Sequence, residues 1–169
     1  MTLKIYGVAF SRAARALWAA EELGLPYEHI KTPFSGGAPR SPEMLKLNPN
    51  GRIPVIDDDG VIVWESMAIN LYLVKKHGAA TPIAPASLEE DALATQWSFW
   101  VMTEIEKPLL TLLMNTLGMS PETPEAVAKA EADLARPLDV LEAHLAGQDW
   151  LVGGRFTVAD INVAEIVRY

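Results

Sequence analysis

Strand-forming segments are confined to the first half of this chain, and this uneven distribution constrains its fold more than any other feature. Before residue 78, short β-prone runs and helical patterns follow one another in the order β-α-β-α-β-β-α. From Ser87 onward, only helical patterns occur. The contrast predicts an α+β protein with one mixed domain over residues 1–78, a linker over 79–86 and an all-helical domain over 87–169.

Turn- and loop-forming residues separate the predicted elements of the first half. Strands are predicted over residues 3–6 and 27–31, and a hairpin over 53–64 is centred on the turn sequence DDDG. Helices are predicted over 11–23 and 65–77, where Gly24 and Gly78 end the patterns. Residues 32–39 are predicted to form a loop. Ser41 followed by Pro42 is typical of the start of a short helix.

The second half carries two sequence patterns that are typical of capped helix starts. Ser87 with Glu90 predicts a capping box at the start of a long helix, and Thr157 with Asp160 predicts a second box. Apolar residues flank the second box where a hydrophobic staple would pack. These signals concern helix starts, and we assign the second box no catalytic role.

Prolines and aromatic residues stand out within the helical patterns of the second half. Pro108 and Pro137 predict kinks in two long helices. Trp97 and Trp100 lie three residues apart and either line a pocket for a substrate or pack in a core or a dimer interface. The spacing itself favours packing.

Composition excludes several classes of function. Fourteen basic against 22 acidic residues give a net charge of −8, which argues against binding to nucleic-acid phosphates. The absence of cysteine excludes disulfides, thiolate metal sites and a cysteine nucleophile. The three histidines match no metal motif, so no metal is expected. No apolar run could span a bilayer and no signal peptide is recognised, so we expect a cytoplasmic protein without membrane contact.

Five segments, in order, resemble the glutathione transferase superfamily, and its bacterial, serine-type members in particular. They read KIYG, SRAARALWAAEELGLPYE, NPNGRIPVI, WESMAINLYL and WLVGGRFTVADINVAE. The resemblance implies a thioredoxin-like N-terminal domain and an all-helical C-terminal domain. Family members continue beyond the TVADI segment, whereas this chain ends at Tyr169 within an apolar helical pattern. We therefore expect the last helices, and part of the substrate pocket, to be missing.

The candidate catalytic group is a hydroxyl that would stabilise the thiolate of bound glutathione. Ser11 is the leading candidate, because FSRAARALW resembles the serine-type classes and because helix N-terminal amides would add to its effect. Tyr6 is the rival, since other classes use a tyrosine near the end of the first strand. The alternative for Ser11 is a simple N-cap. Arg15 is expected to pair with another residue for structural reasons.

Glutathione also needs groups that hold its two carboxylates. Glu65 and Ser66 lie where a strand becomes a helix, and the resemblance assigns them to the γ-glutamyl end. Arg40 and Arg52 are the candidates for the glycyl carboxylate, which a guanidinium can bind with two hydrogen bonds. The alternatives are that Ser66 only caps its own helix and that both arginines are solvated.

The resemblance assigns the Ile53–Pro54 pair to the middle of the ligand. In the family this proline is cis, and the backbone of the residue before it pairs with the cysteinyl segment of glutathione. The alternative is an ordinary trans proline at the start of a strand.

We therefore predict an enzyme that conjugates glutathione, its co-substrate, to a small hydrophobic electrophile. Glutathione-dependent peroxide or disulfide reduction would use the same thiolate. The alternative from another class is a non-catalytic scaffold, dimerisation or ligand-carrier domain, because fold alone does not decide function. The resemblance also implies a homodimer.

Overall fold

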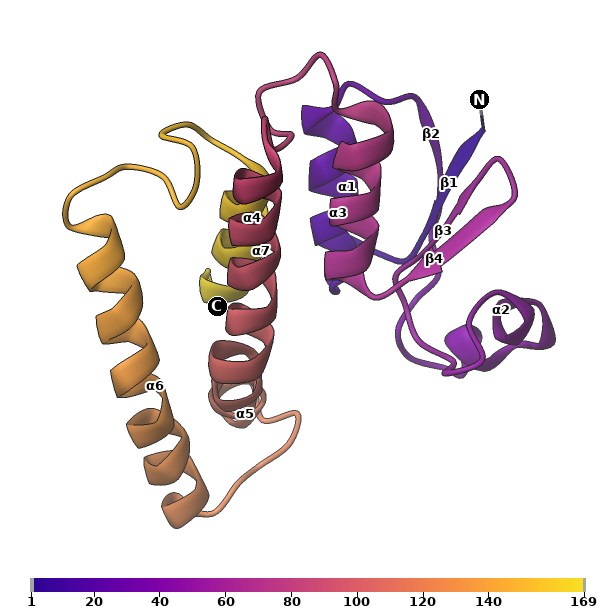
Figure 1. Ribbon diagram of the computed structural model, residues 1–169. Coiled ribbons are helices and arrows are strands. Elements are labelled where there is room, and N and C mark those ends of the chain that lie inside the picture. Colours follow the sequence, from indigo (N-terminus) through magenta and orange to yellow (C-terminus); the bar gives the residue numbers. More distant parts are fainter. Residues whose placement is uncertain (1, 169) are drawn as a thin grey trace. The chain divides into compact units, whose positions relative to one another are not determined.

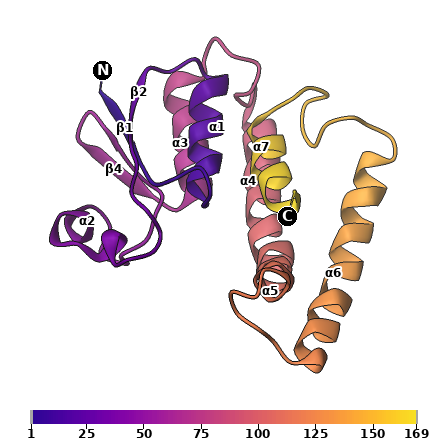
Figure 2. The same ribbon diagram turned by 180° about the vertical axis from the view of Figure 1, so that it is seen from behind.

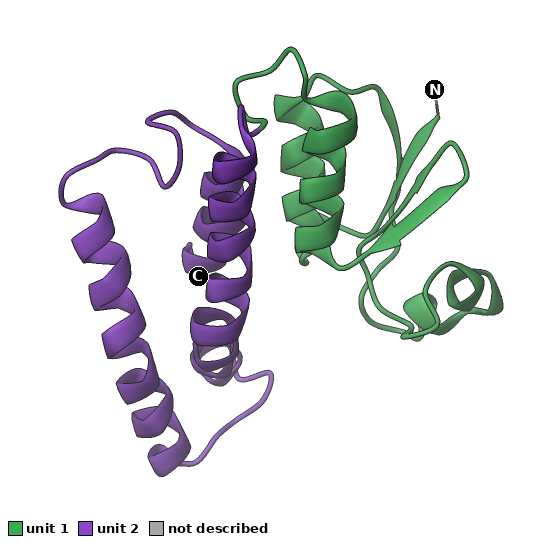
Figure 3. Ribbon diagram, in the orientation of Figure 1, with its two compact units in different colours: residues 1–84 green, residues 85–169 purple. Residues whose placement is uncertain are grey.

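A computed structural model of the protein describes residues 2–168 and divides the chain into two compact units, residues 1–84 and 85–169 (Figure 3). The boundary falls within the segment 79–86. The predicted end of the helical pattern at Tyr169 lies outside the described residues.

Unit 1 contains a four-stranded sheet and the helices that surround it. Helix α1 begins two residues later than predicted, and a short 3-10 helix, η1, lies in and just beyond the predicted 32–39 loop. Its elements are β1 (Leu3–Tyr6), α1 (Ala13–Glu22), β2 (Tyr27–Ile30), η1 (Ala38–Arg40), α2 (Pro42–Leu47), β3 (Val55–Asp58), β4 (Val61–Trp64) and α3 (Ser66–His77).

The sheet has the strand order β2-β1-β3-β4. Strands β1 and β2 are parallel, as a connection through α1 requires, and β3 is antiparallel to both β1 and β4. Helices α1 and α3 lie side by side on one face of the sheet (Figures 1 and 2). The core of this unit is formed by buried aliphatic side chains, which include Leu3, Ile5, Val55, Ile56, Ile69 and Leu73.

One row of the sheet aligns four strand ends. Tyr6 is paired with Ile30 of β2 on one side and with Val55 of β3 on the other, and Val55 is paired with Trp64 of β4. Three strands end at this row and β3 begins there. The segments that follow β1, β2 and β4, and the one that precedes β3, therefore share one edge of the sheet.

A buried carboxylate fixes the opposite end of α3. Asp58, at the end of β3, accepts hydrogen bonds on Oδ2 from Tyr72 Oη at 3.1 Å, Lys76 Nζ at 2.8 Å and His77 Nε2 at 2.8 Å. Burial raises the pKa of Asp58, but the three donors outweigh that effect and the pKa is lowered overall. This cluster ties the last turn of α3 to the hairpin, which helps to hold the first turn of α3 at the other edge.

The regular structure of unit 2 is entirely helical over its described residues, with loops between the helices. Its helices are α4 (Leu88–Trp100), the π-helical segment η2 (Val101–Ile105), α5 (Glu106–Thr116), α6 (Pro124–Leu145) and α7 (Val158–Val167). The helix changes to a π turn just before Pro108, which cannot donate a backbone hydrogen bond. Helix α6 remains helical on both sides of Pro137. No helix within residues 2–168 is both long and apolar enough to cross a bilayer.

The first predicted capping box forms only in part. The Ser87 hydroxyl accepts from the backbone N–H of Glu90 at 3.2 Å, as predicted. The Glu90 carboxylate instead accepts from Ala86 N at 2.8 Å and from both terminal nitrogens of Arg155, at 3.0 and 2.6 Å. This pairing lowers the pKa of Glu90 to about 2, with the Arg155 hydrogen bonds as the largest cause.

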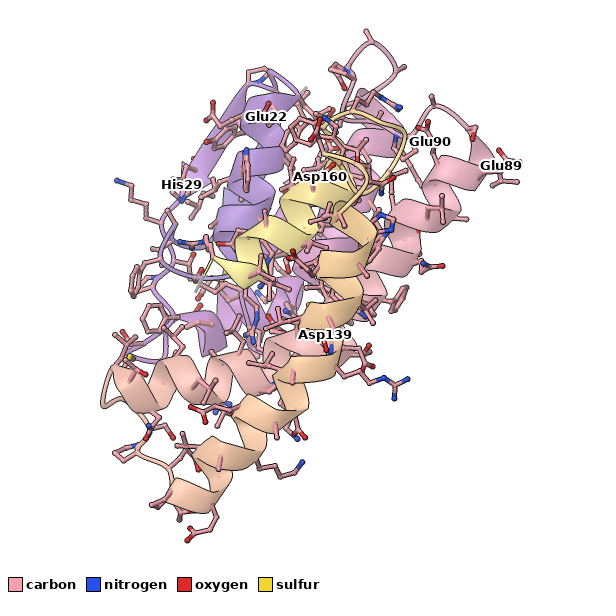
Figure 4. The ribbon with its side chains drawn as sticks, turned by 90° about the vertical axis from the view of Figure 1, so that its left-hand side faces the viewer. Glu22, His29, Glu89, Glu90, Asp139 and Asp160 are labelled. Atoms are coloured by element: carbon pink, nitrogen blue, oxygen red, sulfur yellow. The ribbon has the colours of Figure 1, made fainter. Side chains whose placement is uncertain are left out.

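The second capping box forms as predicted. The Asp160 carboxylate accepts from the backbone N–H of Thr157 at 2.8 Å and from its hydroxyl at 3.0 Å, and also from Leu151 N at 2.9 Å. Asp160 therefore starts α7 and holds the preceding loop at the same time. Figure 4 shows Asp160 on the first turn of α7.

Candidate functional site

The shared edge of the sheet begins at Gly7, directly after β1. Gly7 has φ 141°, and a Cβ added there would lie 2.5 Å from Ala13 Cβ and 3.5 Å from Ile53 Cδ1. Because no side chain fits at this position, the loop, the start of α1 and the start of β3 come into close contact. His29, which is labelled in Figure 4, lies on β2 and donates through Nε2 to the Gly7 carbonyl at 2.8 Å, which connects this loop to β2. No sequence pattern predicted this contact.

Ser11 lies in the loop between β1 and α1, two residues before the helix. Its hydroxyl donates to the Val8 carbonyl at 2.7 Å and accepts from Ala13 N at 3.1 Å. The N-cap position belongs to Arg12, so Ser11 is not the N-cap residue itself. The hydroxyl is half-buried and must turn away from Val8 to donate its proton to a ligand.

Tyr6 reaches the same edge from a different direction. Side chains alternate along a strand, so Tyr6 points to the face opposite Leu3 and Ile5, which are buried in the core. Its ring is half-buried. The structure therefore offers two separate hydroxyls at this edge, one from the loop and one from a face of the sheet.

The Ile53–Pro54 peptide bond is cis, as the resemblance implies. The turn before it is organised by Asn48, a residue 2% exposed that sequence reasoning gave no role. Asn48 Nδ2 donates to the Arg52 carbonyl at 2.9 Å, and Asn48 Oδ1 accepts from Asn50 N at 3.0 Å. An Asn at the start of a Pro- and Gly-containing turn was the signal that could have identified it.

Glu65 and Ser66 join β4 to α3 at this edge. Glu65 is the N-cap residue and has φ 71° and ψ 116°, a backbone conformation that is unfavourable for any residue except glycine. Ser66 is the first residue of α3 and follows the N-cap position, so it does not cap its own helix, and its side chain is buried. Its hydroxyl oxygen accepts from Arg15 Nη1 at 3.0 Å, which agrees with the pairing expected of Arg15. The first backbone N–H groups of α3 lack acceptors within the helix and favour an anion.

The two candidate arginines meet at one turn. A Cβ added to Gly51 would lie 2.7 Å from Arg40 Cγ, so the Arg40 stem crosses the turn that leads into Arg52. Both guanidinium groups belong to exposed residues. The Arg40 stem therefore lies against the turn that precedes Arg52 and the cis proline, where a guanidinium can bind a carboxylate.

The charge at this edge runs against that of the whole chain. The protein carries a net charge of −8. The segments at this edge nevertheless contribute four arginines, Arg12, Arg15, Arg40 and Arg52. The exposed Arg12, Arg40 and Arg52, together with the start of α3, can attract an anionic ligand, whereas Arg15 is buried and contributes its charge without reaching the surface. Among residues 2–168 no group of three or more His, Cys, Asp or Glu side chains is arranged to hold a metal.

The two candidate pocket tryptophans lie in unit 2. Trp97 is buried, with its ring centroid 4.9 Å from that of Trp100 in an edge-to-face arrangement and 4.6 Å from that of His144. This geometry supports the packing alternative for Trp97. A pocket role remains a prediction for both tryptophans, and Trp100 is the more exposed of the two.

Comparison with known proteins matches both halves of the chain to one family. Residues 1–75 match the model of the glutathione S-transferase N-terminal domain, and residues 101–169 match that of the C-terminal domain. Glutathione S-transferase 3 of Zea mays is 36% identical over 96% of this chain and 75% of the relative. Elongation factor 1-gamma 2 of Oryza sativa subsp. japonica is 37% identical over 92% of this chain but only 37% of the relative.

A solved structure shows the same fold. The glutathione transferase URE2P8 from Phanerochaete chrysosporium, crystallised with oxidized glutathione, has a TM-score of 0.86 and 31% sequence identity. The similarity covers 98% of this chain and 79% of that one. The predicted fold class, a thioredoxin-like domain followed by a helical domain, is therefore confirmed.

Proposed function

This chain belongs to the glutathione S-transferase family, and from that premise we propose that it binds glutathione, holds its sulfur as a thiolate and transfers it to a small electrophile. One observation carries the proposal. The aligned strand ends gather the Ser11 loop, the cis Ile53–Pro54 bond and the start of α3 along one edge of a single sheet. The chemistry of these segments matches the successive parts of the tripeptide.

The two ends of glutathione would be held by charge. The γ-glutamyl α-carboxylate would accept from the Ser66 hydroxyl and from the free N–H groups that begin α3, while Glu65 would accept from the α-amine. The glycyl carboxylate would lie against Arg40 and Arg52. Between them, the backbone of Ile53 would pair with the cysteinyl segment.

The sulfur would then lie near the Ser11 loop. There the Ser11 hydroxyl, released from Val8, would donate to the thiolate. The thiol proton leaves to solvent. The sulfur lone pair then forms a bond to the electrophilic carbon of the second substrate, and the leaving group departs with the electron pair of its broken bond. In an addition, the π electrons of the attacked double bond move instead to the neighbouring atom, which takes a proton from water. Lowering the thiol pKa by one unit takes about 1.4 kcal/mol of preference for the thiolate, which one charge-assisted hydrogen bond can supply. The hydroxyl acts as a donor and forms no covalent bond.

The decisive experiment is a pH titration of thiolate ultraviolet absorbance for glutathione bound to the wild type, Ser11→Ala and Tyr6→Phe. We expect a thiol pKa in the wild type below that of free glutathione, raised by about one unit or more in Ser11→Ala. Tyr6→Phe, which removes the other hydroxyl, should leave the pKa unchanged. A loss confined to Tyr6→Phe would move the catalytic role to Tyr6.

A second candidate function is a non-catalytic binding or scaffold domain. The similarity to elongation factor 1-gamma, a protein whose name states no transferase activity, is the observation that favours it. Glutathione bound with an unshifted thiol pKa, or no glutathione binding at all, would support this alternative. The retained hydroxyl, cis proline and arginines favour the enzyme, because a scaffold has no chemical need for them.

We also propose that the protein forms a homodimer and that its second substrate is a hydrophobic electrophile. One of the two edge strands, β4, leaves Val61, Ile62 and Trp64 exposed, and an exposed apolar edge strand is a surface that a partner can cover. Sedimentation equilibrium tests the dimer directly. A monomer at micromolar concentration would contradict it.

A further inference from the structure

Arg15 is an unusual residue to find inside a small domain. It lies on α1 with 0% of its surface exposed, although a guanidinium is charged at any ordinary pH. Its Nη1 donates to the hydroxyl oxygen of Ser66 at 3.0 Å, across from one helix to another. Ser66 itself is only 4% exposed. A buried charge is costly unless it is hydrogen-bonded, and the bond to Ser66 is one of the interactions that hold the Arg15 guanidinium.

The direction of this hydrogen bond determines which further hydrogen bond Ser66 can form. A guanidinium can only donate, so the Ser66 oxygen is the acceptor. A hydroxyl has one proton, and this bond does not use it. Among residues 2–168 no acceptor takes the Ser66 proton. Ser66 therefore keeps a hydrogen-bond donor to offer.

The location of Ser66 favours an anionic acceptor for that proton. It is the first residue of α3, a helix of 12 residues, where the backbone N–H groups of the first turn also have no acceptor within the helix. The N-cap residue, Glu65, makes no side-chain cap hydrogen bond that would use those groups. The Arg15 guanidinium, which is hydrogen-bonded to the Ser66 oxygen, brings a positive charge to this first turn and adds to its attraction for a carboxylate.

We propose that Arg15 is a positioning residue. By donating a hydrogen bond to the Ser66 oxygen, it orients the hydroxyl so that Ser66 presents its proton to the α-carboxylate of the γ-glutamyl group. The inference rests on the proposed function, and it deepens that function by naming a residue that acts on the ligand through another. Arg15 does not touch glutathione. It polarises the Ser66 O–H bond and fixes which side of the oxygen carries the proton.

The test compares two ligands on four proteins and one control variant. The ligands are glutathione and 4-aminobutanoyl-cysteinylglycine, which differs from it only by lacking the α-carboxylate. The proteins are the wild type, Arg15→Lys, Ser66→Ala and the double variant, and calorimetry gives each Kd. Arg136→Lys, an exposed residue on α6, is the matched control for the exchange of arginine for lysine.

We expect Arg15→Lys and Ser66→Ala each to weaken glutathione binding about tenfold, the effect of one hydrogen bond to a charged group. Each should change the affinity for the analogue less than twofold. The double variant should be no weaker than Ser66→Ala, because Arg15 acts only through Ser66. Arg136→Lys should change neither affinity.

Three outcomes would overturn the inference. If Arg15→Lys lowered the affinity for both ligands equally, Arg15 would be a purely structural residue. If the losses of affinity of the two single variants multiplied in the double variant, the two residues would act independently. Should Arg15→Lys fail to fold, Ser66→Ala alone decides, since an unchanged preference for glutathione over the analogue would contradict the proposal. If wild-type protein binds neither ligand, the proposed function itself has failed, which is a distinct result.

Discussion

Two buried serines, one in each unit, show how differently the halves of this protein use the same chemistry. Ser98 on α4 donates to the Ala94 carbonyl at 2.7 Å and accepts from Asn162 Nδ2 at 2.8 Å, so its proton and its oxygen are both used within unit 2. Ser66 in unit 1 accepts from Arg15 and keeps its proton. The difference teaches that a hydroxyl whose proton and oxygen are both used supports the fold, whereas one with an unused donor can still take part in the ligand binding that we propose.

The acidic residues repeat this contrast. Asp160 in unit 2 is buried and accepts three hydrogen bonds from the loop and the helix start around it. Glu65 in unit 1 is exposed, occupies a strained backbone conformation and caps no helix with its side chain. In unit 2, the buried Asp160 stabilises the fold. In unit 1, the backbone of Glu65 is strained at the edge of the sheet where we propose that the ligand binds.

The largest effect is expected where the fold uses a polar group most completely. Asp160→Ala removes three hydrogen bonds and leaves two buried backbone donors unpaired, so we expect the free energy of unfolding to fall by about 3 kcal/mol. Urea denaturation followed by circular dichroism measures this. Asp139→Ala, an exposed position on α6 (Figure 4), should change it by less than about 0.5 kcal/mol. If Asp160→Ala lowered the free energy of unfolding by less than about 1 kcal/mol, the idea that unit 2 uses its buried polar groups for stability would be wrong.

The next effect separates the two serines directly. Ser98→Ala takes an acceptor from the buried amide of Asn162 and should lower stability by about 2 kcal/mol without changing the Kd for glutathione. Ser66→Ala should change that Kd. The contrast breaks if Ser98→Ala weakens glutathione binding as strongly as Ser66→Ala does.

A smaller and pH-dependent effect is expected at the Glu90–Arg155 pair. Since the pKa of Glu90 falls from its usual 4.5 to about 2 on folding, the pair stabilises the protein fully above pH 4.5 and loses this contribution as the pH falls toward 2. We expect Glu90→Gln to cost about 1–2 kcal/mol at pH 7, allowing for partial exposure of both side chains. The cost should shrink steadily below pH 4.5. Chemical denaturation of both proteins at several pH values tests this, and a pH-independent difference would refute it.

The smallest effect has the opposite sign. Glu65→Gly places at φ 71° the residue that tolerates positive φ, and we expect it to stabilise the protein by about 1 kcal/mol after the entropy cost of glycine. It should also weaken glutathione binding, because the acceptor for the α-amine is lost. Thermal unfolding and calorimetry on the same variant measure both. A destabilised variant would show that the strain at Glu65 is compensated locally.

Local sequence signals predicted the elements of this fold well. Ser41 accepts from Met44 N at 3.3 Å at the start of α2, and the hairpin turn lies where Asp57 and Gly60 predicted it. Such signals succeed because both partners lie within a few residues, so the sequence spacing fixes their geometry. The fold class was predictable for the same reason, since each helix and strand pattern is local.

Pairs that are distant in sequence escaped prediction. Glu90 matched a local capping box, but Arg155 from a loop far along the chain takes most of its carboxylate. In the same way, spacing could not assign Ser66 to Arg15 or His144 to Trp97. Each depends on which helices pack together, a property of the whole core that no short pattern encodes.

The π-helical turn at Val101–Ile105 has a geometric consequence for unit 2. Each residue of an α-helix advances the chain by about 100° around the axis, and a π turn holds roughly one residue more than an α turn. The residues of α5 are therefore rotated about the helix axis, relative to those of α4, by about the 100° that one extra residue adds. A chain with one residue fewer between Val101 and Ile105 would run as a continuous α-helix and present a different side of α5 to α6. The extra residue therefore rotates α5 about its axis. This rotation determines which side of α5 packs against α6, with no change of side chain in either helix.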